Sequence, residues 1–337
     1  MRRTAATTPV RDDLMIRASG LRKTYRGRKA KAVEAVRGVD FAVRTGEIFG
    51  FLGPNGAGKS TTLRMLATLT RPDGGRATIG GFDLLRAPAR VRDVIGFVAQ
   101  TSGTYAEATG WQELVLQARM YGLSRSRAES LAESAVAAFE LAEFADRRIE
   151  TYSGGQRRRL DVALGVIHGP TAMFLDEPTA GLDPPSRMRV WQEVRRLRDE
   201  GMTIFLTTHY LDEADALCDR ISIIDRGLIV AEGTPSELKR EISGDVVIVD
   251  LAAPDTAGVV DDTTLAEAAE VLAGEPYVHD LESVNTTLRL YVDSAATAIP
   301  LIIRSLIGAR VEPVAIESRR PSLDDVFLAK TGRILRD

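Results

Sequence analysis

The chain has 337 residues, of which 44% are hydrophobic and 27% charged, and its formal net charge at pH 7 is −3. This length allows two domains or one large domain, and the hydrophobic content is ample for a buried core. A slightly acidic chain without an extended field of one sign gives no electrostatic reason to expect nucleic acid as a partner. The single cysteine, Cys218, excludes an intramolecular disulfide and a cysteine-based zinc cluster, and it fits a reducing cytosol.

The N-terminal segment is basic, but no apolar core follows it. Residues 1–12 are therefore predicted to be a disordered tail and not a secretory signal. The densest late apolar stretch, residues 299–303, is interrupted by Arg304, and no run is long enough for a membrane span. We expect a chain that does not cross a membrane.

Short apolar strands alternate with amphipathic helices from about residue 16 to residue 232, which predicts an α/β fold with a mostly parallel sheet. We expect strands at 39–43, 48–52, 94–98, 172–175, 203–207, 221–224 and 228–231. We expect helices at 59–69 and, within a helical insertion covering about 101–169, at 111–121, 125–139 and 155–167.

A second domain is predicted after Ser243 and Gly244, where a short helix at 236–241 ends and the sequence pattern changes. The segment 244–337 is expected to be a small α+β domain that does not repeat the first, which covers 13–243. Its elements are expected at 246–251, 264–273, 287–292, 296–307 and 314–317, before a final helix that Ser322 caps.

A glycine-rich loop directly follows the apolar strand at 48–52 and precedes a helix. Its glycines allow backbone N–H groups to point at phosphate oxygens, and the helix adds the positive end of its dipole. Lys59 is expected to reach the β- and γ-phosphates, and the Ser60 hydroxyl to bind Mg²⁺. A glycine-rich turn with a chance lysine is the alternative. The predicted phosphate-binding residues are Gly53, Pro54, Asn55, Gly56, Ala57, Gly58, Lys59, Ser60 and Thr61.

Two carboxylates end the buried strand at 172–175, at the edge where a parallel sheet places its functional groups. Asp176 is expected to hold Mg²⁺, directly or through water, opposite Ser60. Glu177 is expected to act as general base on the water that attacks the γ-phosphate. The alternative is that both residues only cap the turn at Pro178.

A serine and two glycines at a predicted helix start form a possible second anion site, although an ordinary helix start carries the same residues. Combined with the loop, the paired carboxylates and His209, the arrangement resembles the ATP-binding cassette (ABC) family, whose signature motif Ser153, Gly154, Gly155 and Gln156 match. The resemblance covers about residues 16–241 and implies a P-loop NTPase cassette with a helical subdomain.

The resemblance also implies roles for single residues. Gln100 would contact Mg²⁺ or the attacking water, and His209 would contact the γ-phosphate and steady that water. Asp183 would couple the two nucleotide sites of a dimer, and capping of the helix from Pro184 is equally consistent with its position. Tyr25 would stack on adenine.

In this family the signature serine acts in trans, so the resemblance implies a head-to-tail homodimer with two ATP and Mg²⁺ at its interface. It also implies a separate integral-membrane permease, which would place the chain at the cytoplasmic face of the cell membrane. The helical insertion around 111–121 would form the groove that receives the permease.

The final motif at 321–328 resembles the closing motif of daunorubicin–doxorubicin resistance ATPases, which favours export. The segment after Gln100 departs from that branch at 101–105, Trp111 and Gln112, so the cargo stays open between natural products, lipids and polysaccharides. Regulation, dimerisation and packing alone are open roles for the C-terminal domain. A soluble ABC ATPase acting on ribosomes or DNA is the alternative function, and a non-catalytic regulatory cassette is a third.

Overall fold

The computed structural model describes residues 13–26, 32–242, 244–251, 262–284 and 286–332. By internal contacts these residues form two compact units, which divide between Pro235 and Ser236. The short helix α8 (Pro235–Arg240) thus falls almost wholly in the second unit, whereas the sequence analysis places the boundary at Ser243. The predicted tail at 1–12 lies outside the described residues.

The first unit contains an antiparallel sheet that the sequence analysis does not predict as such. Its strand order is β2-β1-β4-β5, and register shifts interrupt the pairing of β1 with both neighbours. Only part of β2 was expected, because glycines and bulges break the alternation of apolar residues that marks a strand. The strands are β1 (Leu14–Tyr25), β2 (Val33–Arg44), β4 (Gly74–Ile79) and β5 (Phe82–Asp83).

The predicted, mostly parallel sheet is confirmed. It has six strands in the order β10-β9-β3-β8-β7-β6, and every neighbouring pair is parallel except β10 with β9. β3, β7 and β8 are buried along their whole length, as expected for central strands covered on both faces. The strands are β3 (Ile48–Leu52), β6 (Ile95–Val98), β7 (Ala172–Asp176), β8 (Thr203–Thr208), β9 (Arg220–Asp225) and β10 (Leu228–Gly233).

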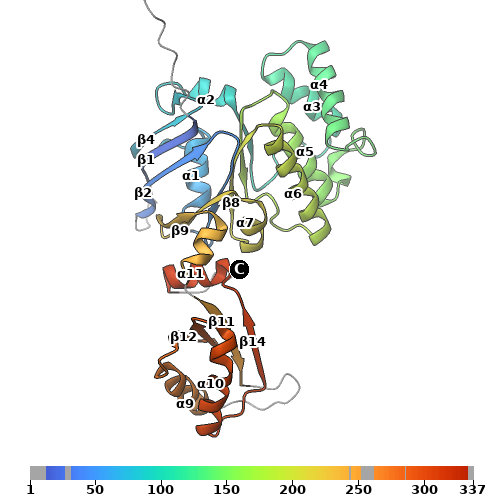
Figure 1. Cartoon of the computed structure of the whole chain (residues 1–337). Helices are drawn as coiled ribbons and strands as arrows, with labels where there is room; N and C mark the ends of the chain where they lie inside the picture. The colour runs from blue at the N-terminus through green and yellow to red at the C-terminus, as the bar shows by residue number, and fades with distance from the viewer. Residues whose placement is uncertain (1–12, 27–31, 243, 252–261, 285, 333–337) are drawn as a thin grey trace, which may run out of the picture. The chain divides into compact units, whose positions relative to one another are not determined.

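Aromatic rings join the two sheets of this unit. Phe41 of the antiparallel sheet packs on Phe49, Phe51 and Phe205 of the parallel sheet, with ring centroids 5.4 to 5.9 Å apart. The helix α1 (Lys59–Leu66) contacts β2 of one sheet and β7 and β8 of the other (Figure 1). This core fixes the start of α1 against the ends of the parallel strands.

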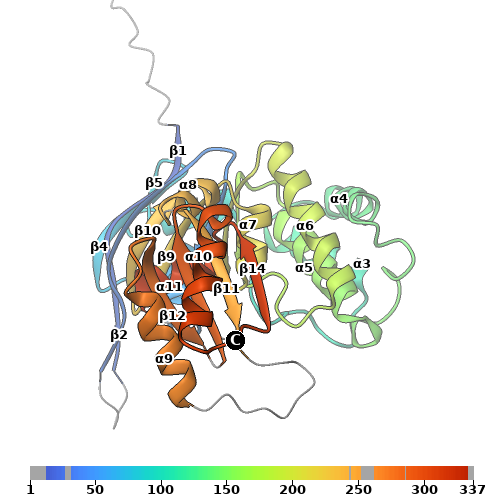
Figure 2. The ribbon, with the colours of Figure 1, turned by 60° about the horizontal axis from the view of Figure 1, so that its bottom comes forward.

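Helices occupy the segment between β6 and β7, as predicted, and lie to one side of the sheets (Figure 2). Thr109 and Ser124 cap the first two of them with their side chains. The elements of this segment are α3 (Gly110–Met120), α4 (Arg125–Ala138), the short 3₁₀ helix η1 (Ile149–Thr151) and α5 (Gly154–Val166). The remaining helices of the unit are α2 (Pro88–Val94), α6 (Pro184–Asp199) and α7 (Leu211–Leu217).

The second unit is an α+β fold, as expected. Its antiparallel sheet has the order β12-β13-β11-β14, and an apolar core joins the sheet to α9 and α10 (Figure 1). β12 was not predicted, because its sequence is largely polar. The elements are β11 (Asp245–Asp250), α9 (Asp262–Ala273), β12 (Val278–Val284), β13 (Thr287–Val292), α10 (Ala295–Gly308), β14 (Ala315–Arg319) and α11 (Leu323–Thr331).

Within the described residues, no helix combines the length and the apolar character that crossing a membrane requires.

Candidate active site

The glycine-rich loop has a shape that only glycine allows at two points. A Cβ on Gly53 would lie 2.2 Å from the carbonyl oxygen of Ile224, and a Cβ on Gly58 would lie 2.4 Å from that of Ala35. Gly58 also has a φ of 109°, which a side chain would strain. The close packing therefore holds the loop tightly around the start of α1, where a helix N-terminus favours anions.

Lys59 is buried in the fold of this loop, with 4% of its surface exposed. Its Nζ donates to the carbonyl oxygens of Gly53 at 2.7 Å and Pro54 at 3.1 Å. The same ammonium lies 3.2 Å from Oε1 of Glu177. Burial lowers the pKa of Lys59 below its ordinary value, against the opposing attraction of Glu177 and Asp176.

Asp176 ends β7 beside the loop and is almost fully buried. Its Oδ1 accepts from the hydroxyl of Ser60 at 2.8 Å and from that of Thr207 at 2.7 Å. Its Oδ2 is buried and has no hydrogen-bond partner in the described structure. A buried carboxylate oxygen without a partner is costly unless a ligand uses it.

This carboxylate and the Ser60 hydroxyl fit a magnesium ion. Both are hard oxygen donors, and Mg²⁺ in phosphate sites takes one or two protein oxygens and completes its shell with phosphate and water. Within the described residues, no group of three or more acidic, histidine or cysteine side chains could hold a metal by itself. The free Oδ2 of Asp176 is thus suited to a cation that arrives with a phosphate.

The carboxylate of Glu177 is the meeting point of three predicted site residues. Gln100 donates from Nε2 to Oε2 of Glu177 at 2.9 Å. Nδ1 of His209 lies 3.3 Å from the same oxygen without hydrogen-bond geometry, and Lys59 lies at the other oxygen. The structure therefore brings Gln100, His209 and Lys59 together around one acidic group.

The predicted signature residues form the start of α5. Ser153 accepts from the N–H of Gln156 at 3.2 Å, and the side chain of Gln156 accepts from the N–H of Ser153 at 3.0 Å. This reciprocal capping box gives both residues a structural role in the chain itself. A Cβ on Gly155 would lie 2.5 Å from the hydroxyl of Ser186 on α6, so this glycine allows the two helices to approach closely.

Asp183 caps α6, which was one of its two expected roles. Hydrogen bonds from Ser186 lower the pKa of the Asp183 carboxyl, first from the side chain and then from the N–H, which donates at 3.2 Å.

Tyr25 ends β1, where its backbone pairs with Val33 of β2, and the residue is 44% exposed. Two residues after Val33 in β2, the backbone of Ala35 lies against Gly58 of the phosphate loop. Tyr25 therefore lies on the antiparallel sheet near that loop. Residues 27–31, which come shortly after Tyr25, lie outside the described residues.

The signature residues are not part of the cluster around Glu177. Within the described residues, no hydrogen bond or ion pair joins Ser153 or Gln156 to Lys59, Asp176 or Glu177. A single chain therefore presents two separate sets of groups suited to phosphate.

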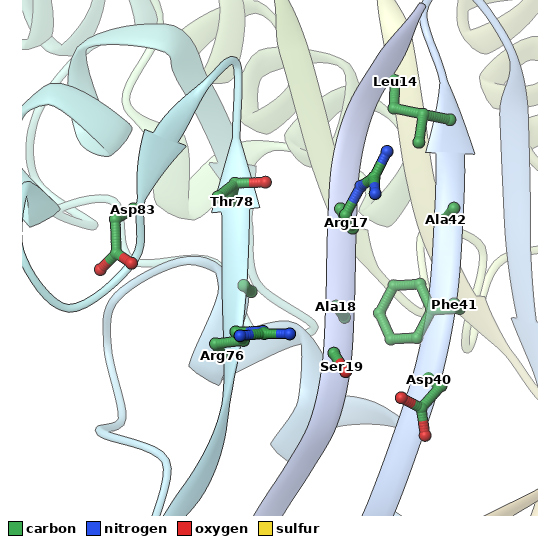
Figure 3. A pocket seen from close by; sticks show the side chains of 11 residues that line it. Leu14, Arg17, Ala18, Ser19, Asp40, Phe41, Ala42, Arg76, Thr78 and Asp83 are labelled. Carbon is green, nitrogen blue, oxygen red and sulfur yellow. The ribbon is translucent and has the colours of Figure 1, made fainter. Parts of the chain in front are cut away.

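A different pocket, of about 610 Å³, lies on the antiparallel sheet and contains none of the predicted site residues (Figure 3). Arg17 and Arg76 face it together with Asp40 and Asp83. Backbone N–H groups already bond to one oxygen of each carboxylate, from Gly20 to Asp40 and from the turn after β5 to Asp83. The balanced charges of this pocket do not point to a particular ligand.

Comparisons with known proteins agree with this geometry. The ABC transporter family matches residues 36–180, and the family "ATP-binding protein DrrA1-3-like, C-terminal domain" matches residues 233–331. The daunorubicin resistance ATP-binding protein DrrA2 of Streptomyces coeruleorubidus is 43% identical over 327 residues, which cover 95% of this chain and 96% of that protein. The chain belongs to the ABC transporter ATP-binding family. It is an ABC ATPase of the DrrA-like branch.

Two further relatives support the assignment. The linearmycin resistance ATP-binding protein LnrL of Bacillus subtilis is 35% identical over 96% of this chain and all of that protein. A dimeric ATP-binding cassette, MJ0796, solved in a post-hydrolysis state with ADP and phosphate, has a TM-score of 0.60. It is 25% identical and covers 65% of this chain and 98% of its own. ABC ATPases bind nucleotide, and the predicted P-loop NTPase fold is confirmed.

The sequence analysis did not single out some residues that reach the cluster of this ABC ATPase. Thr207 donates to Asp176 and also accepts from the N–H of Glu177 at 3.1 Å. Arg158 of α5 is buried behind the same segment. A threonine that ends a buried strand gives a weak signal in the sequence, because serine and threonine are common there for other reasons.

Proposed function

We propose that this ABC ATPase is the ATP-hydrolysing subunit of an exporter whose membrane channel is a separate polypeptide. The observation that carries the proposal is the carboxylate of Glu177, which Lys59, Gln100 and His209 surround next to the free oxygen of Asp176. That arrangement supports hydrolysis of a phosphoanhydride, because a general base, a phosphate-binding cation and a metal ligand meet in one place.

Each group takes a separate part in the proposed reaction. Lys59 and the N–H groups of the loop bind the phosphates, and Tyr25 stacks on the adenine. Ser60, Asp176 and the amide oxygen of Gln100 are the groups that would hold Mg²⁺, which when bound neutralises charge on the phosphate oxygens. Glu177 accepts a proton from the attacking water, and His209 orients that water and the γ-phosphate.

The active form in this proposal is a head-to-tail homodimer. Within the described residues no hydrogen bond or ion pair joins Ser153 to Lys59, which supports a second copy as the source of the Ser153 and Gly155 that reach the nucleotide. The dimeric state of the MJ0796 cassette supports this assembly. Asp183 at the start of α6 would link the two sites, and closure around two ATP would supply the work stroke.

A groove on the helical segment supports docking of a permease. It measures about 710 Å³ and lies between α3 and α4, where Trp111, Leu116 and Met120 line it. Met120 is 74% exposed and Leu116 is 44% exposed, which is unusual for such apolar side chains without a partner. The permease would hold the subunit at the cytoplasmic face of the membrane.

The relatives favour a drug or another amphipathic natural product as cargo. DrrA2 and LnrL are resistance proteins for daunorubicin and linearmycin, and both match nearly the whole chain. Neither is a ribosome or DNA-repair ATPase, so the soluble alternative has no support among them. The C-terminal domain, which both of these relatives cover, would serve dimer stability or regulation.

The proposal is tested by purifying the Glu177→Gln variant with Mg²⁺-ATP from detergent-solubilised native membranes and identifying the proteins that accompany it. Blocked hydrolysis should hold the closed dimer on its permease, so one polytopic membrane protein should appear in near-stoichiometric amount. The matched control is Glu177→Gln with Lys59→Ala, which should lose nucleotide and therefore the permease. Recovery of ribosomal or DNA-repair proteins without a membrane protein would contradict the proposal.

A further inference from the structure

The backbone at Glu177 is strained. Its φ is +46°, a left-handed conformation that residues other than glycine rarely adopt. Such strain persists only where the surrounding structure fixes it, and it is concentrated at functional sites. The segment of Pro178 and Thr179, which directly follows Glu177, is held from two sides.

Arg158 holds this segment from the side of α5. Its side chain is 6% exposed, and its Nε donates to the carbonyl oxygen of Pro178 at 2.7 Å. Its Nη2 donates to the carbonyl oxygen of Asp176 at 3.3 Å. The guanidinium thus spans Glu177, bonding to the residues immediately before and after it.

The same guanidinium also reaches the loop that carries Gln100. Nη1 donates to the carbonyl oxygen of Ala99 at 2.7 Å. Ala99 directly precedes Gln100, whose amide contacts the carboxylate of Glu177. The planar guanidinium of Arg158 therefore sets the spacing between the loop that carries Gln100 and the segment that carries Glu177.

Glu213 of α7 holds the segment from the other side. It is fully buried, and its Oε1 accepts from the hydroxyl of Thr179 at 2.7 Å and from the indole of Trp191 at 3.1 Å. α7 begins two residues after His209, so this carboxylate also connects the His209 segment to the chain after Glu177.

We propose that Arg158 and Glu213 are positioning residues that clamp Pro178 and Thr179, and thereby hold the strained Glu177 with its carboxylate aimed at Gln100 and His209. Neither side chain bonds to the carboxylate of Glu177 itself. Both act through the backbone and through Thr179. The inference rests on the proposed role of Glu177 as general base.

The chemistry of the clamp favours a role in catalysis over simple core stability. The Arg158 guanidinium bonds to three neutral carbonyl oxygens and lies 4.0 Å from Asp161, and Glu213 is bonded through Oε1 while its buried Oε2 has no partner in the described structure. Such buried charged groups are costly ways to fill a core. They are effective ways to fix geometry, because a misplacement of 1 Å in a catalytic group can reduce a rate by about a hundredfold.

The experiment compares Thr179→Val with Thr179→Ser in the full-length chain. The valine keeps the shape but removes the hydroxyl that bonds to Glu213, whereas the serine keeps the hydroxyl. Thr179→Val should lower kcat for ATP by about 10- to 100-fold while KM stays within about threefold, since the phosphate loop is untouched. Thr179→Ser should recover most of the rate.

Ser222→Ala is the matched control for stability. Ser222 is fully buried and donates to Oε2 of Glu232 at 2.6 Å, so its removal also breaks a bond between a hydroxyl and a carboxylate. Within the described residues, no hydrogen bond or ion pair joins it to the cluster around Glu177. Ser222→Ala should lower Tm about as much as Thr179→Val without the fall in kcat.

Arg158→Lys tests the other half of the clamp. It keeps the charge but cannot reach three carbonyl oxygens, so kcat should again fall while KM holds. Because both halves act on one segment, Arg158→Lys combined with Thr179→Val should lose less than the product of the two single losses.

The outcomes separate the clamp from the proposed function. If Thr179→Val lowers Tm but leaves kcat unchanged, or raises KM alone, the clamp is overturned and the role of Glu177 stands. If Glu177→Gln hydrolyses ATP as fast as the wild type in the same assay, the role of Glu177 fails and the clamp fails with it.

Discussion

Each unit of the molecule contains a buried aspartate, and the two differ in what their oxygens contact. Asp325, at the start of α11, is fully buried and has both oxygens bonded. Arg319 donates to each of them, at 2.6 and 2.8 Å, and Ser322 donates to Oδ2 from its N–H and its hydroxyl. Asp176 has one oxygen bonded and one without a partner in the described structure.

The difference separates a structural carboxylate from one that is suited to a ligand. The protein satisfies Asp325 completely, with a cation, so nothing is left to bind. Asp176 is held in place through one oxygen by Ser60 and Thr207, which fixes the direction of the other. Glu213 also has a buried oxygen without a partner in the described structure, Oε2, so this feature points to a binding site only where other ligand-binding groups surround it, as Lys59 and Ser60 do at Asp176.

The largest expected effect comes from Asp176→Asn. We expect kcat/KM for Mg²⁺-ATP to fall about a thousandfold, because a bound cation contributes several kcal/mol to stabilising phosphate charge. Tm should stay the same or rise, because the amide still accepts from Ser60 and a buried charge is removed. Steady-state kinetics and thermal unfolding measure the two effects. If Asp176→Asn lowers Tm but leaves kcat/KM unchanged, Asp176 is the structural carboxylate and the comparison with Asp325 is wrong.

Whereas Asp176→Asn should lower the rate, Asp325→Ala should lower stability. It leaves the guanidinium of Arg319 unpaired and removes the capping box of α11, so the second unit should lose about 3 kcal/mol of unfolding free energy. Both tryptophans, Trp111 and Trp191, lie in the first unit, so their fluorescence reports that unit alone. Hydrogen exchange in β11 and β13 reports the stability of the second unit. Unchanged protection there would show that Asp325 is not needed for the fold.

A smaller effect is expected from Ser322→Ala. Ser322 caps α11 and donates to Asp325, and loss of such a cap costs about 1 kcal/mol. Hydrogen exchange within α11 should increase while exchange in the first unit does not change. Ser322→Thr, which keeps the hydroxyl, is the control and should behave nearly as the wild type.

The smallest effect is the dependence of stability on pH. Burial alone would raise the pKa of Asp325, but Arg319 and Ser322 outweigh it and hold the pKa below its ordinary value. A carboxyl with a lowered pKa contributes stability that is present above about pH 4 and is lost as the pH falls through its folded value. The free energy of unfolding of the second unit, measured with urea, should therefore fall more steeply below pH 4 in the wild type than in Asp325→Asn. Equal slopes would remove Asp325 as the cause.

Where the sequence signals are local, the structure places the predicted site residues in the expected elements. The phosphate loop, the carboxylates after β7 and the start of α5 each depend on a few adjacent residues, so the motif itself carries the geometry. The strands that escaped prediction, β1, β4, β5 and β12, have weaker local signals. β1 is irregular around Gly20, and β12 is mostly polar.

Contacts that depend on strand register could not be predicted. Thr207 reaches Asp176 because β8 lies beside β7 with those two residues opposite each other. Arg158 reaches Ala99 and Pro178 because α5 packs where β6 and β7 end. These partners are far apart in sequence, and no single segment indicates that they come into contact.

The central claim, that the free oxygen of Asp176 receives a nucleotide-bound cation, is tested most directly with Mn²⁺ in place of Mg²⁺. Electron paramagnetic resonance would measure Mn²⁺ binding with ATP to Glu177→Gln alone, with Asp176→Asn added, and with Asp325→Asn added. We predict one Mn²⁺ per bound ATP, an affinity at least about tenfold weaker with Asp176→Asn, and no change with Asp325→Asn. Equal affinity in all three proteins would contradict the account.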